Sequence, residues 1–542
     1  MKEVQARAAA RQRLLNALVR ETDAEVAAGE LRMTLRGAHG TLVAEVCRES
    51  EVGHHVYGDG LFRESGGSRA RLEHDEFVAL VAEELQRRGA PTPPGSAERF
   101  RRQVANSEAR SARYLARRAG PPPAAPTEIT RHAEQSLLLG HPFHPTPKSA
   151  EGIADDDLER YAPELEARFR LHYWAVAPEV LLEERIGCGR WIPERVEREA
   201  RTLLGAAREH FELLPVHPWQ ADYLRSRAAE LIAEGELVPL GPLGDEVYAT
   251  SSVRTVCDPA FGTAWKLPLH VRITNFVRNN PLEHLRRAVD AGRLVAAADW
   301  DHDGFRVLPE TGYRAIAPGA SGELAADFAV LFRHNPFPGS TTAPRVLAAL
   351  LEDRLDGTPP PLIEEIARAG PLVPEHVVEW LRCYLRISLG PLLSVFTEQG
   401  ISFEAHVQNS LLHTEDGWPR TFYVRDMEGT SASGERIPAG VLPTDSPVRY
   451  DDVEAWLRLR YHFVTNHLGH LVAVLGRFTP AGERLLWSAV HDFLAHCPGR
   501  YAERLRRDPA LPAKANLISR FAEHGESPLY VDIPNPIREV NR

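Results

Sequence analysis

The sequence has few cysteines and no apolar run of the roughly 18 residues that a membrane span requires. Its first 21 residues, MKEVQARAAARQRLLNALVRE, are charged and have no continuous apolar core, so they match neither a signal peptide nor an anchor. The five cysteines are scattered without a C-x-x-C pair, which favours a reducing compartment. We therefore expect a cytoplasmic protein that does not have a membrane as its partner.

An excess of positive charge is also missing, because the formal net charge is -11 and the pI is near 6.1. Nucleic acid is thereby disfavoured as the main partner, since phosphate backbones bind basic surfaces. The sequence has no G-x-x-x-x-G-K-[ST] loop, no G-x-G-x-x-G after a strand and no G-x-S-x-G elbow. P-loop, Rossmann and α/β-hydrolase folds are excluded on this ground, so side chains must hold any bound phosphates.

The length of 542 residues, with 43% apolar and 26% charged residues, is typical of a globular chain of two or three domains. Stretches rich in proline and glycine at residues 89–95, 120–126 and 357–361 mark its divisions. They separate a helical first region, a middle of mixed pattern and a largely helical last third. In that third, Asp451 with Glu454 starts a helix whose apolar residues recur at helical spacing from Val453 to Leu471.

The most informative stretch is EAHVQNSLLHTEDGWPRTFYVRDMEG at residues 404–429, which predicts two strands joined at an Asp416-Gly417 turn. Side chains alternate along a strand, so we expect three polar groups on one face of the first strand and an acid opposite them on the second. A polar strand face in contact with water would give the same pattern.

The polar groups of this predicted hairpin suit a magnesium ion. Glu404, His406 and Gln408 would share one face, with Asp426 roughly opposite His406 and Asn409 beside them. Oxygen ligands on two strands fit Mg²⁺, which prefers one or two carboxylates together with substrate phosphates.

A second polar cluster is the loop GHPFHPTPKS at residues 140–149, in which three prolines forbid a helix and favour a rigid extended loop. His141, His144 and Lys148 favour anion binding there. A metal site and a purely structural loop remain alternatives, although zinc needs further ligands of nitrogen or sulfur type. The HPWQ run at residues 217–220 is weaker, since such a run is more often a packed corner.

The third cluster combines residues 251–256 with residues 266–280 and predicts a phosphate site. Strand alternation from Lys266 onward puts apolar residues on one face and these polar ones on the other: Lys266, His270, Arg272 and Thr274. We expect Thr274 to cap a helix that contains Arg278 and to end the strand at an anion-binding helix terminus. Ser252, Arg254 and Thr255 would lie on a neighbouring strand or its turn. A solvated basic face is the alternative.

Together these stretches resemble one family, the NRPS-independent siderophore synthetases of the aerobactin-synthetase type. The resemblance rests on six motifs in order across residues 140–426: the GHPxHP loop with its lysine, HPWQ, S-x-R-T, the Lys-Leu strand leading to Thr274 and Arg278, E-x-H-x-Q-N, and Arg-Asp. The segment KANLISRF at residues 514–521 is similar to the family's C-terminal lysine segment. One departure is Ala150, where the family usually has arginine, and the chain is also short at its N-terminus.

The resemblance implies an α+β fold shaped like a cupped hand, with a helical thumb at residues 1–130, β-containing fingers at 131–345 and a mostly helical palm at 346–542. It implies an AMP-forming ligase that uses ATP and Mg²⁺, and usually a homodimer. Such an enzyme adenylates a carboxylate, typically citrate, a citrate monoamide or 2-oxoglutarate, and passes the acyl group to an amine or hydroxyl. A kinase-type Mg²⁺ phosphotransferase, which releases ADP, is the alternative reading of the residues.

Carried onto this sequence, the family pattern also assigns roles. Around ATP it implies His144, Lys148, Ser252, Arg254, Thr255, Lys266, His406, Gln408 and Asn409. For the substrate carboxylates it implies His141, Thr274, Arg278 and Lys514. As ligands of Mg²⁺ it implies Glu404, Asn409 and Asp426. For contacts in the transition state we expect His406, Arg278 and Lys266.

Overall fold

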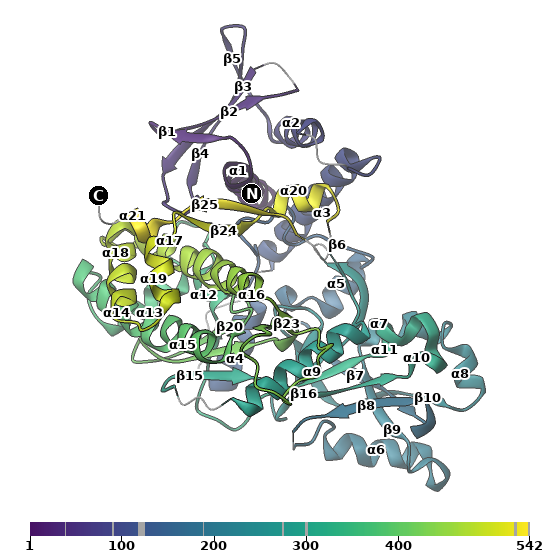
Figure 1. Cartoon of the computed structure of the whole chain (residues 1–542). Helices are drawn as coiled ribbons and strands as arrows, with labels where there is room; N and C mark the ends of the chain where they lie inside the picture. The colour runs from purple at the N-terminus through teal and green to yellow at the C-terminus, as the bar shows by residue number, and fades with distance from the viewer. Residues whose placement is uncertain are drawn as a thin grey trace.

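The computed structural model describes residues 1–37, 40–88, 92–117, 125–187, 189–273, 276–298, 302–524 and 528–539. Helices and sheets occur in all three regions of the chain, so the predicted α+β class is confirmed. In Figure 1 the N-terminal region lies at the top, the largest sheet at the lower right and the C-terminal helices at the left. Among the described residues, no helix combines the length and apolar character needed to cross a membrane.

The first region was predicted to be helical, and this prediction is incomplete because it also contains a five-stranded antiparallel sheet. The strands are β1 (Glu25–Ala27), β2 (Glu30–Leu35), β3 (Gly40–Arg48), β4 (Val56–Ser65) and β5 (Ser68–Arg71). Strand β2 alternates buried and exposed side chains, as a half-buried strand does, but over too few residues to stand out from the helical pattern around it. The helices are α1 (Lys2–Glu21), α2 (His74–Arg87) and α3 (Ser96–Ala116).

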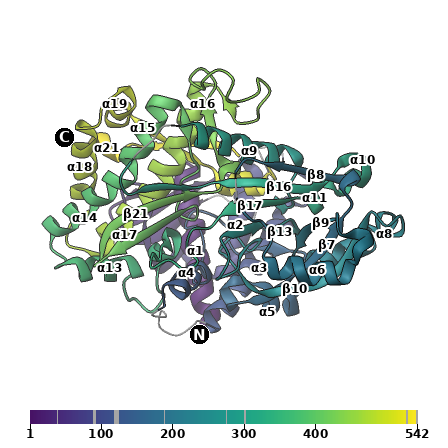
Figure 2. The same ribbon diagram turned by 90° about the horizontal axis from the view of Figure 1, so that it is seen from below.

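The middle region is built on an eight-stranded sheet in the order β8-β16-β17-β12-β11-β10-β7-β9, and Figure 2 shows its strands from below. The strands are β7 (Arg168–Val176), β8 (Leu181–Arg185), β9 (Glu212–Val216), β10 (Leu237–Ala249), β11 (Thr255–Cys257), β12 (Thr263–Lys266), β16 (Glu310–Ile316) and β17 (Val330–His334). Helix α6 (Glu194–Leu204) packs on β10 and α9 (Leu282–Ala297) on β16. The remaining helices of this region are α4 (Pro126–Gln135), α5 (Asp155–Tyr161), α7 (Pro218–Arg225), α8 (Ala229–Ala233), α10 (Pro318–Ser321) and α11 (Ala325–Phe328).

The strand predicted to run on from Lys266 is interrupted. Lys266 ends β12 of the large sheet, and the chain continues as β13 (Leu269–Ile273) in a separate three-stranded sheet with β14 (Phe276–Arg278) and β6 (Ala150–Glu151). Pro268 lies at the break, where a residue without an N–H cannot continue the ladder. The helix expected to contain Arg278 is wrong, since Arg278 belongs to β14 and the next helix, α9, begins at Leu282. Thr274 lies outside the described residues.

The last region is largely helical and encloses the largest core, in which Trp380, Trp456 and Trp487 are almost completely buried. Its α-helices are α12 (Leu347–Leu351), α13 (Pro361–Ala369), α14 (Pro374–Ile387), α15 (Leu389–Gln399), α16 (Asp452–Leu459), α17 (Gly469–Phe478), α18 (Gly482–Ala495), α19 (Arg500–Arg507), α20 (Asn516–Phe521) and α21 (Pro536–Glu539), and the π-helix Arg460–Leu468 joins α16 to α17. The predicted Asp451 cap is confirmed, because its side chain accepts the N–H of Glu454 at 2.7 Å. Val453, the first residue of the apolar pattern predicted for this helix, is 71% exposed.

Short strands connect this helical body to the rest. A four-stranded sheet joins β15 (Phe305–Leu308), β21 (Trp418–Arg425), β20 (Ser410–Glu415) and β18 (Arg345–Val346), and a three-stranded one joins β19 (Ile401–Ser402), β22 (Ser431–Ser433) and β23 (Arg449–Tyr450). Strands β24 (Ala510–Lys514) and β25 (Tyr530–Pro534) pair, and α20 then packs on α1 beside the N-terminal sheet. The predicted boundaries after residues 130 and 345 fall inside α4 and β18, and the division into three domains stays a prediction.

Candidate active site

The predicted hairpin exists and turns at the predicted place. Strands β20 and β21 pair antiparallel, and Asp416 and Gly417 between them have φ values of 48° and 82°. Two consecutive residues with positive φ are typical of the tight turn that Asp-Gly favours. A Cβ on Gly417 would also collide with the backbone of Glu365 and Ala369 on α13. Both the positive φ and the close approach of α13 therefore require glycine at this position.

The first half of the predicted strand is wrong, because residues 404–409 form a turn. The N–H of Asn409 donates to the carbonyl of His406 at 2.9 Å, and the ring Nδ1 of His406 accepts the N–H groups of Gln408 and Asn409 at 3.3 Å each. Bonds of this kind from a side chain to its own backbone compete with a strand ladder. The register is also shifted: the N–H of Arg425 donates to the carbonyl of Asn409, so Asp426 does not lie opposite His406.

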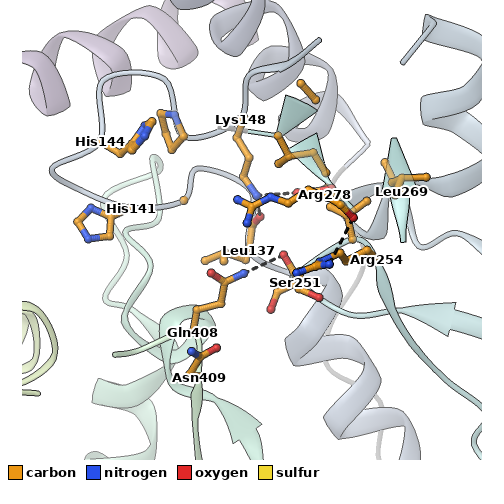
Figure 3. Close-up of a pocket in the computed structure, with 18 of the residues that line it drawn as sticks. Leu137, His141, His144, Lys148, Ser251, Arg254, Leu269, Arg278, Gln408 and Asn409 are labelled. Atoms are coloured by element: carbon orange, nitrogen blue, oxygen red, sulfur yellow. Dashed lines mark hydrogen bonds and ion pairs between the residues drawn. The ribbon is translucent and has the colours of Figure 1, made fainter. Parts of the chain in front are cut away.

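The turn nevertheless carries its side chains into the same place as the other predicted clusters. A cavity of about 430 Å³ opens between the three regions of the chain. The predicted residues that line it are His141, His144, Lys148, Ser252, Arg254, Lys266, Arg278, Glu404, His406, Gln408, Asn409, Asp426 and Lys514. Figure 3 shows the loop histidines, Lys148, Arg254 and Arg278 around this space, with Gln408 and Asn409 below them.

Three of the residues that the sequence singled out lie apart from the cavity wall. Thr255 is buried in β11, where it pairs directly with Lys266 of β12. His270, expected on the cationic face, contacts the carboxylate of Asp327 at 3.0 Å. Arg272 is exposed on β13. The break at Pro268 places His270 and Arg272 in a different sheet from Lys266, so the three do not form one cationic face.

At the acidic side of the cavity, Lys266 is buried between two carboxylates. Its Nζ lies 2.5 Å from Asp426 Oδ1 and 2.6 Å from Glu428 Oε2. Burial alone would raise the pKa of Asp426, but Lys266 and Arg333 lower it to about 2. The pKa of Glu428 also lies well below its usual range, against the effect of burial, because Lys266, His284 and Arg254 are close. Both carboxylates are therefore ionised at neutral pH.

The turn 251–254 supplies cationic and hydroxyl groups next to these carboxylates, with Arg254 Nη2 3.6 Å from Glu428 Oε2. Ser252 Oγ accepts the N–H of Thr255 at 3.2 Å, and Arg254 Nη1 donates to the carbonyls of Arg278 and Asn279 at 3.3 and 3.1 Å. Burial lowers the pKa of Arg278 to about 10, with Arg254 acting in the same direction. Arg278 therefore stays protonated near neutral pH, and two guanidinium groups lie close together at this wall.

The histidine loop is held from behind by a buried carboxylate. Glu352 accepts the backbone N–H groups of Leu138, Leu139 and Gly140 at 2.7, 2.7 and 2.9 Å. Successive N–H groups around one carboxylate form a nest that fixes the backbone. These bonds hold the backbone where the loop begins. The loop is not helical, as the prolines predicted, but it is not extended either, since the N–H groups of His144 and Ser149 donate to the carbonyls of His141 and Thr146.

The cationic and imidazole groups of the loop face the cavity. Lys148 Nζ contacts Glu164 Oε1 at 2.6 Å, and a ring nitrogen of His141 lies 3.1 Å from Asn466 Oδ1. Burial, with smaller effects of His144 and other cations, holds the pKa of His141 well below its usual range. At neutral pH its imidazole is therefore uncharged and suited to hydrogen bonding.

His406 faces the cavity from the acidic side. Its pKa is also lowered, again first by burial. Since its Nδ1 accepts two backbone N–H groups, the ring proton is assigned to Nε2, which makes His406 a hydrogen-bond donor toward the cavity. This combination of neutral donors and fixed cations suits an anionic substrate.

Lys514 ends β24, and the helix α20 of the segment KANLISRF begins two residues later at Asn516. Its Nζ lies 5.0 Å from the centroid of the Tyr461 ring, within cation–π range. Burial lowers the pKa of Lys514, and Glu404 acts against that effect.

Several cavity residues were missed by reasoning from the sequence. Glu428 follows Asp426 by two residues and shares Lys266 with it. Arg110 reaches the cavity from α3 beside Ala150: its Nε donates to Asn106 Oδ1, which also accepts the N–H of Ala150, both at 3.2 Å. Arg110 had no local signal, since the sequence does not distinguish it from the solvent-exposed arginines of the same helix. Further missed lining residues are Glu164, Tyr461, His462 and Asn466, whereas His217 and Trp219, which also line the cavity, belong to the HPWQ run that was interpreted as a packed corner.

The donor set for Mg²⁺ fits the ion in kind. Glu404, Asn409 and Asp426 all line the cavity and offer two carboxylates and an amide oxygen, the hard ligands that Mg²⁺ prefers. Among the residues that the structure describes, three or more His, Cys, Asp or Glu side chains do not gather as a metal site. Any magnesium here would therefore depend on the amide and on substrate oxygens as well as on the two acids.

Comparison with known proteins assigns the two halves of the cavity to known sequence families. The model of the IucA / IucC family matches residues 130–352, which carry the histidine loop and the cationic turn. A second model, described as ferric iron reductase FhuF-like transporter, matches residues 378–529, which carry the acidic hairpin and Lys514.

Among curated proteins, the chain is 37% identical to the L-2,3-diaminopropanoate–citrate ligase of Staphylococcus aureus (strain NCTC 8325 / PS 47), over 92% of this chain and 90% of that protein. It is 29% identical to the spermidine-citrate ligase of Bacillus anthracis, over 92% and 89%. Among solved structures, it is similar to ATP-bound aerobactin synthetase IucA from a hypervirulent pathotype of Klebsiella pneumoniae. That likeness, with a TM-score of 0.85 and 24% identity over 98% of this chain and 99% of that one, concerns the fold.

Proposed function

This chain belongs to the IucA/IucC family, and from that premise we propose that it is an ATP-dependent siderophore synthetase. It would adenylate a carboxylate of citrate or a citrate derivative and pass the acyl group to an amine. Citrate is the acyl substrate named for both similar ligases, and their other substrates are amines. The observation that carries the proposal is the convergence of cations, neutral histidines and ionised carboxylates in one cavity.

The first step would join citrate to the nucleotide. A carboxylate oxygen attacks the α-phosphorus of ATP, the bond to the β-phosphate oxygen breaks and pyrophosphate leaves. Two anions must approach one another, so fixed cations on both are needed. We assign Ser252, Arg254 and Lys266 to the phosphates, together with His144, Lys148 and the turn residues His406, Gln408 and Asn409. Thr255, which the family pattern adds to this set, is buried in β11 behind them.

The citrate carboxylates would lie against the loop and the wall of β14. His141, Arg278 and Lys514 line the cavity and offer a neutral donor and two cations. Thr274, which the family pattern adds to this set, lies outside the described residues. Arg110 lies beside Ala150, the position at which the family usually has arginine. We propose that Arg110 supplies the positive charge of that arginine.

Mg²⁺ would be held by Glu404, Asn409 and Asp426, and when bound it would neutralise charge on the phosphate oxygens. Asp426 is then shared between the metal and Lys266, which keeps the carboxylate ionised for either partner. In the second step the amine nitrogen attacks the acyl carbon, AMP leaves and the nitrogen loses a proton. A homodimer, which the family resemblance implies, and a cytoplasmic location, which the scattered cysteines favour, remain predictions.

Product analysis tests the reaction. With ATP, Mg²⁺ and citrate, hydroxylamine should trap the acyl adenylate as a hydroxamate, with AMP and pyrophosphate released in equal amounts. A panel of diamines and amino acids should then compete with hydroxylamine and identify the nucleophile. ADP with inorganic phosphate in place of AMP would reject adenylation and favour the phosphotransferase alternative.

A further inference from the structure

A buried carboxylate outside the cavity wall ties the two sides of the site together. Glu134 lies near the end of α4 and is 2% exposed. Its Oε1 lies 2.5 Å from Arg425 Nη1, and its Oε2 accepts the N–H and the Oγ–H of Ser251 at 3.1 and 2.9 Å. One side chain thus contacts the residue before Ser252 and the residue before Asp426.

The contacts close into a ring through Gln408, in the turn 404–409 that precedes β20. The side-chain amide of Gln408 donates to the carbonyl of Ser251 at 3.0 Å, which Figure 3 shows, and Arg425 Nη2 donates to the carbonyl of Gln408 at 2.9 Å. Hydrogen bonds thus connect Glu134 to Ser251, Ser251 to Gln408 and Gln408 to Arg425, and Arg425 closes the ring by contacting Glu134. Since they come from three segments far apart in the chain, the ring fixes how far the phosphate turn lies from the acidic turn.

Burial of a carboxylate is costly unless it is paired and hydrogen-bonded, and Glu134 meets both conditions. Burial would raise the pKa of Glu134, yet Arg425 and the two groups of Ser251 keep it below its ordinary value. Its charge is thereby matched on both sides. A glutamine in its place would present an NH₂ group to either the guanidinium or the N–H of Ser251, and one contact would be lost.

We propose that Glu134 is a positioning residue that sets the gap between the phosphate-binding turn 251–254 and the metal-binding turn 404–409, so that one MgATP bridges both. This inference rests on the proposed function. Glu134 is not assigned a contact with substrate, because it does not line the cavity and acts through Ser251 and Arg425. Its loss should therefore weaken nucleotide and metal use more than citrate use.

Three variants of the full chain test the proposal. Glu134→Gln should raise KM for MgATP about tenfold or more and raise the Mg²⁺ concentration for half-maximal activity, with KM for citrate changed less than twofold. Ser251→Ala removes one bond from the ring without leaving a buried charge, so it should shift the same constants about threefold and covers the case in which Glu134→Gln does not fold. Glu134→Asp should also have a raised KM for MgATP, since the shorter aspartate side chain cannot reach both Ser251 and Arg425.

Glu84→Gln is the matched control. Glu84 is also 2% exposed, contacts Arg88 at 2.9 Å and accepts the backbone N–H of Arg36 at 2.9 Å, but it lies in the N-terminal region away from the cavity. It should lower stability while leaving the MgATP and Mg²⁺ constants within twofold of the native protein. If Glu134→Gln and Ser251→Ala behave as Glu84→Gln does, the positioning role is overturned.

Calorimetric titration with α,β-methylene-ATP and Mg²⁺ separates this inference from the proposed function. Native protein that does not bind this nucleotide would reject the proposed function itself. Native protein that binds it, with equal affinity in Glu134→Gln, would reject the positioning role alone. Binding weakened about tenfold in Glu134→Gln and unchanged in Glu84→Gln is the expected result.

Discussion

Replacing Lys266 with alanine tests whether one buried cation serves both the fold and the reaction. Its side chain is 4% exposed and contacts Asp426 at 2.5 Å and Glu428 at 2.6 Å. Removing one partner of a buried ion pair costs about 3 to 5 kcal/mol, because the remaining charge stays buried. Arg333 lies 3.4 Å from Asp426 and Arg254 lies 3.6 Å from Glu428, and both remain in the variant. We therefore expect a loss near the lower end, about 3 kcal/mol.

The same change should reduce turnover by a separate route. Loss of one electrophilic donor costs about 2 to 4 kcal/mol of transition-state stabilisation, or roughly 30- to 900-fold in kcat/KM. The double variant Lys266→Ala/Glu428→Gln separates the two effects, since it also removes one of the stranded carboxylates. Stability should recover in part, whereas turnover should stay low because the cation is still missing.

Two measurements on each variant decide the matter. Urea unfolding followed by tryptophan fluorescence reports the stability, with the buried Trp265 next to the site as one of the reporters. Pyrophosphate release at saturating Mg²⁺ reports kcat/KM. If Lys266→Ala alone keeps kcat/KM within threefold of the native protein, the catalytic assignment of Lys266 is refuted. Turnover that recovers together with stability in the double variant would show that Lys266 acts only through the fold.

Three further predictions follow from the geometry. Asp426→Asn should raise the Mg²⁺ requirement in a titration of activity, whereas His144→Ala should weaken ATP or citrate use at an unchanged Mg²⁺ requirement; the opposite pattern would reverse the metal assignment. Burial raises the pKa of the Glu21 carboxyl to about 8, so the folded protein binds this proton more tightly than the unfolded chain does. The resulting contribution to stability should be complete below pH 4.5 and lost as pH rises through 8. Over that range the urea unfolding midpoint should fall less in Glu21→Gln than in the native protein, and parallel curves would contradict this. Arg110→Ala should raise KM for citrate about tenfold while KM for MgATP holds, with recovery in Arg110→Ala/Ala150→Arg; equal effects on both substrates would remove Arg110 from the citrate site.

Local signals predicted local structure well. The Asp416-Gly417 turn and the Asp451 cap are confirmed, because each depends on residues within a few positions of one another. The strand through residues 404–409 failed for an equally local reason that alternation alone does not show. His406 accepts two backbone N–H groups and so closes a turn where the pattern predicted a ladder. At Lys266 the pattern also continued across a proline that ends the strand.

The kinds of groups in the cavity were predictable, and their partners were not. Cations, imidazoles and acids were each identified from short motifs, and thirteen of the predicted residues line one cavity. Yet the contact between Lys266 and Asp426 joins residues 160 positions apart, and the contact between Glu134 and Arg425 joins residues 291 apart. No periodicity in the sequence reports such pairs, since they arise only when separate sheets and helices pack. The predicted cationic face is for this reason not a free phosphate site: Lys266 is already neutralised by two carboxylates, and a nucleotide must compete with them or bring a metal ion that takes over their charge.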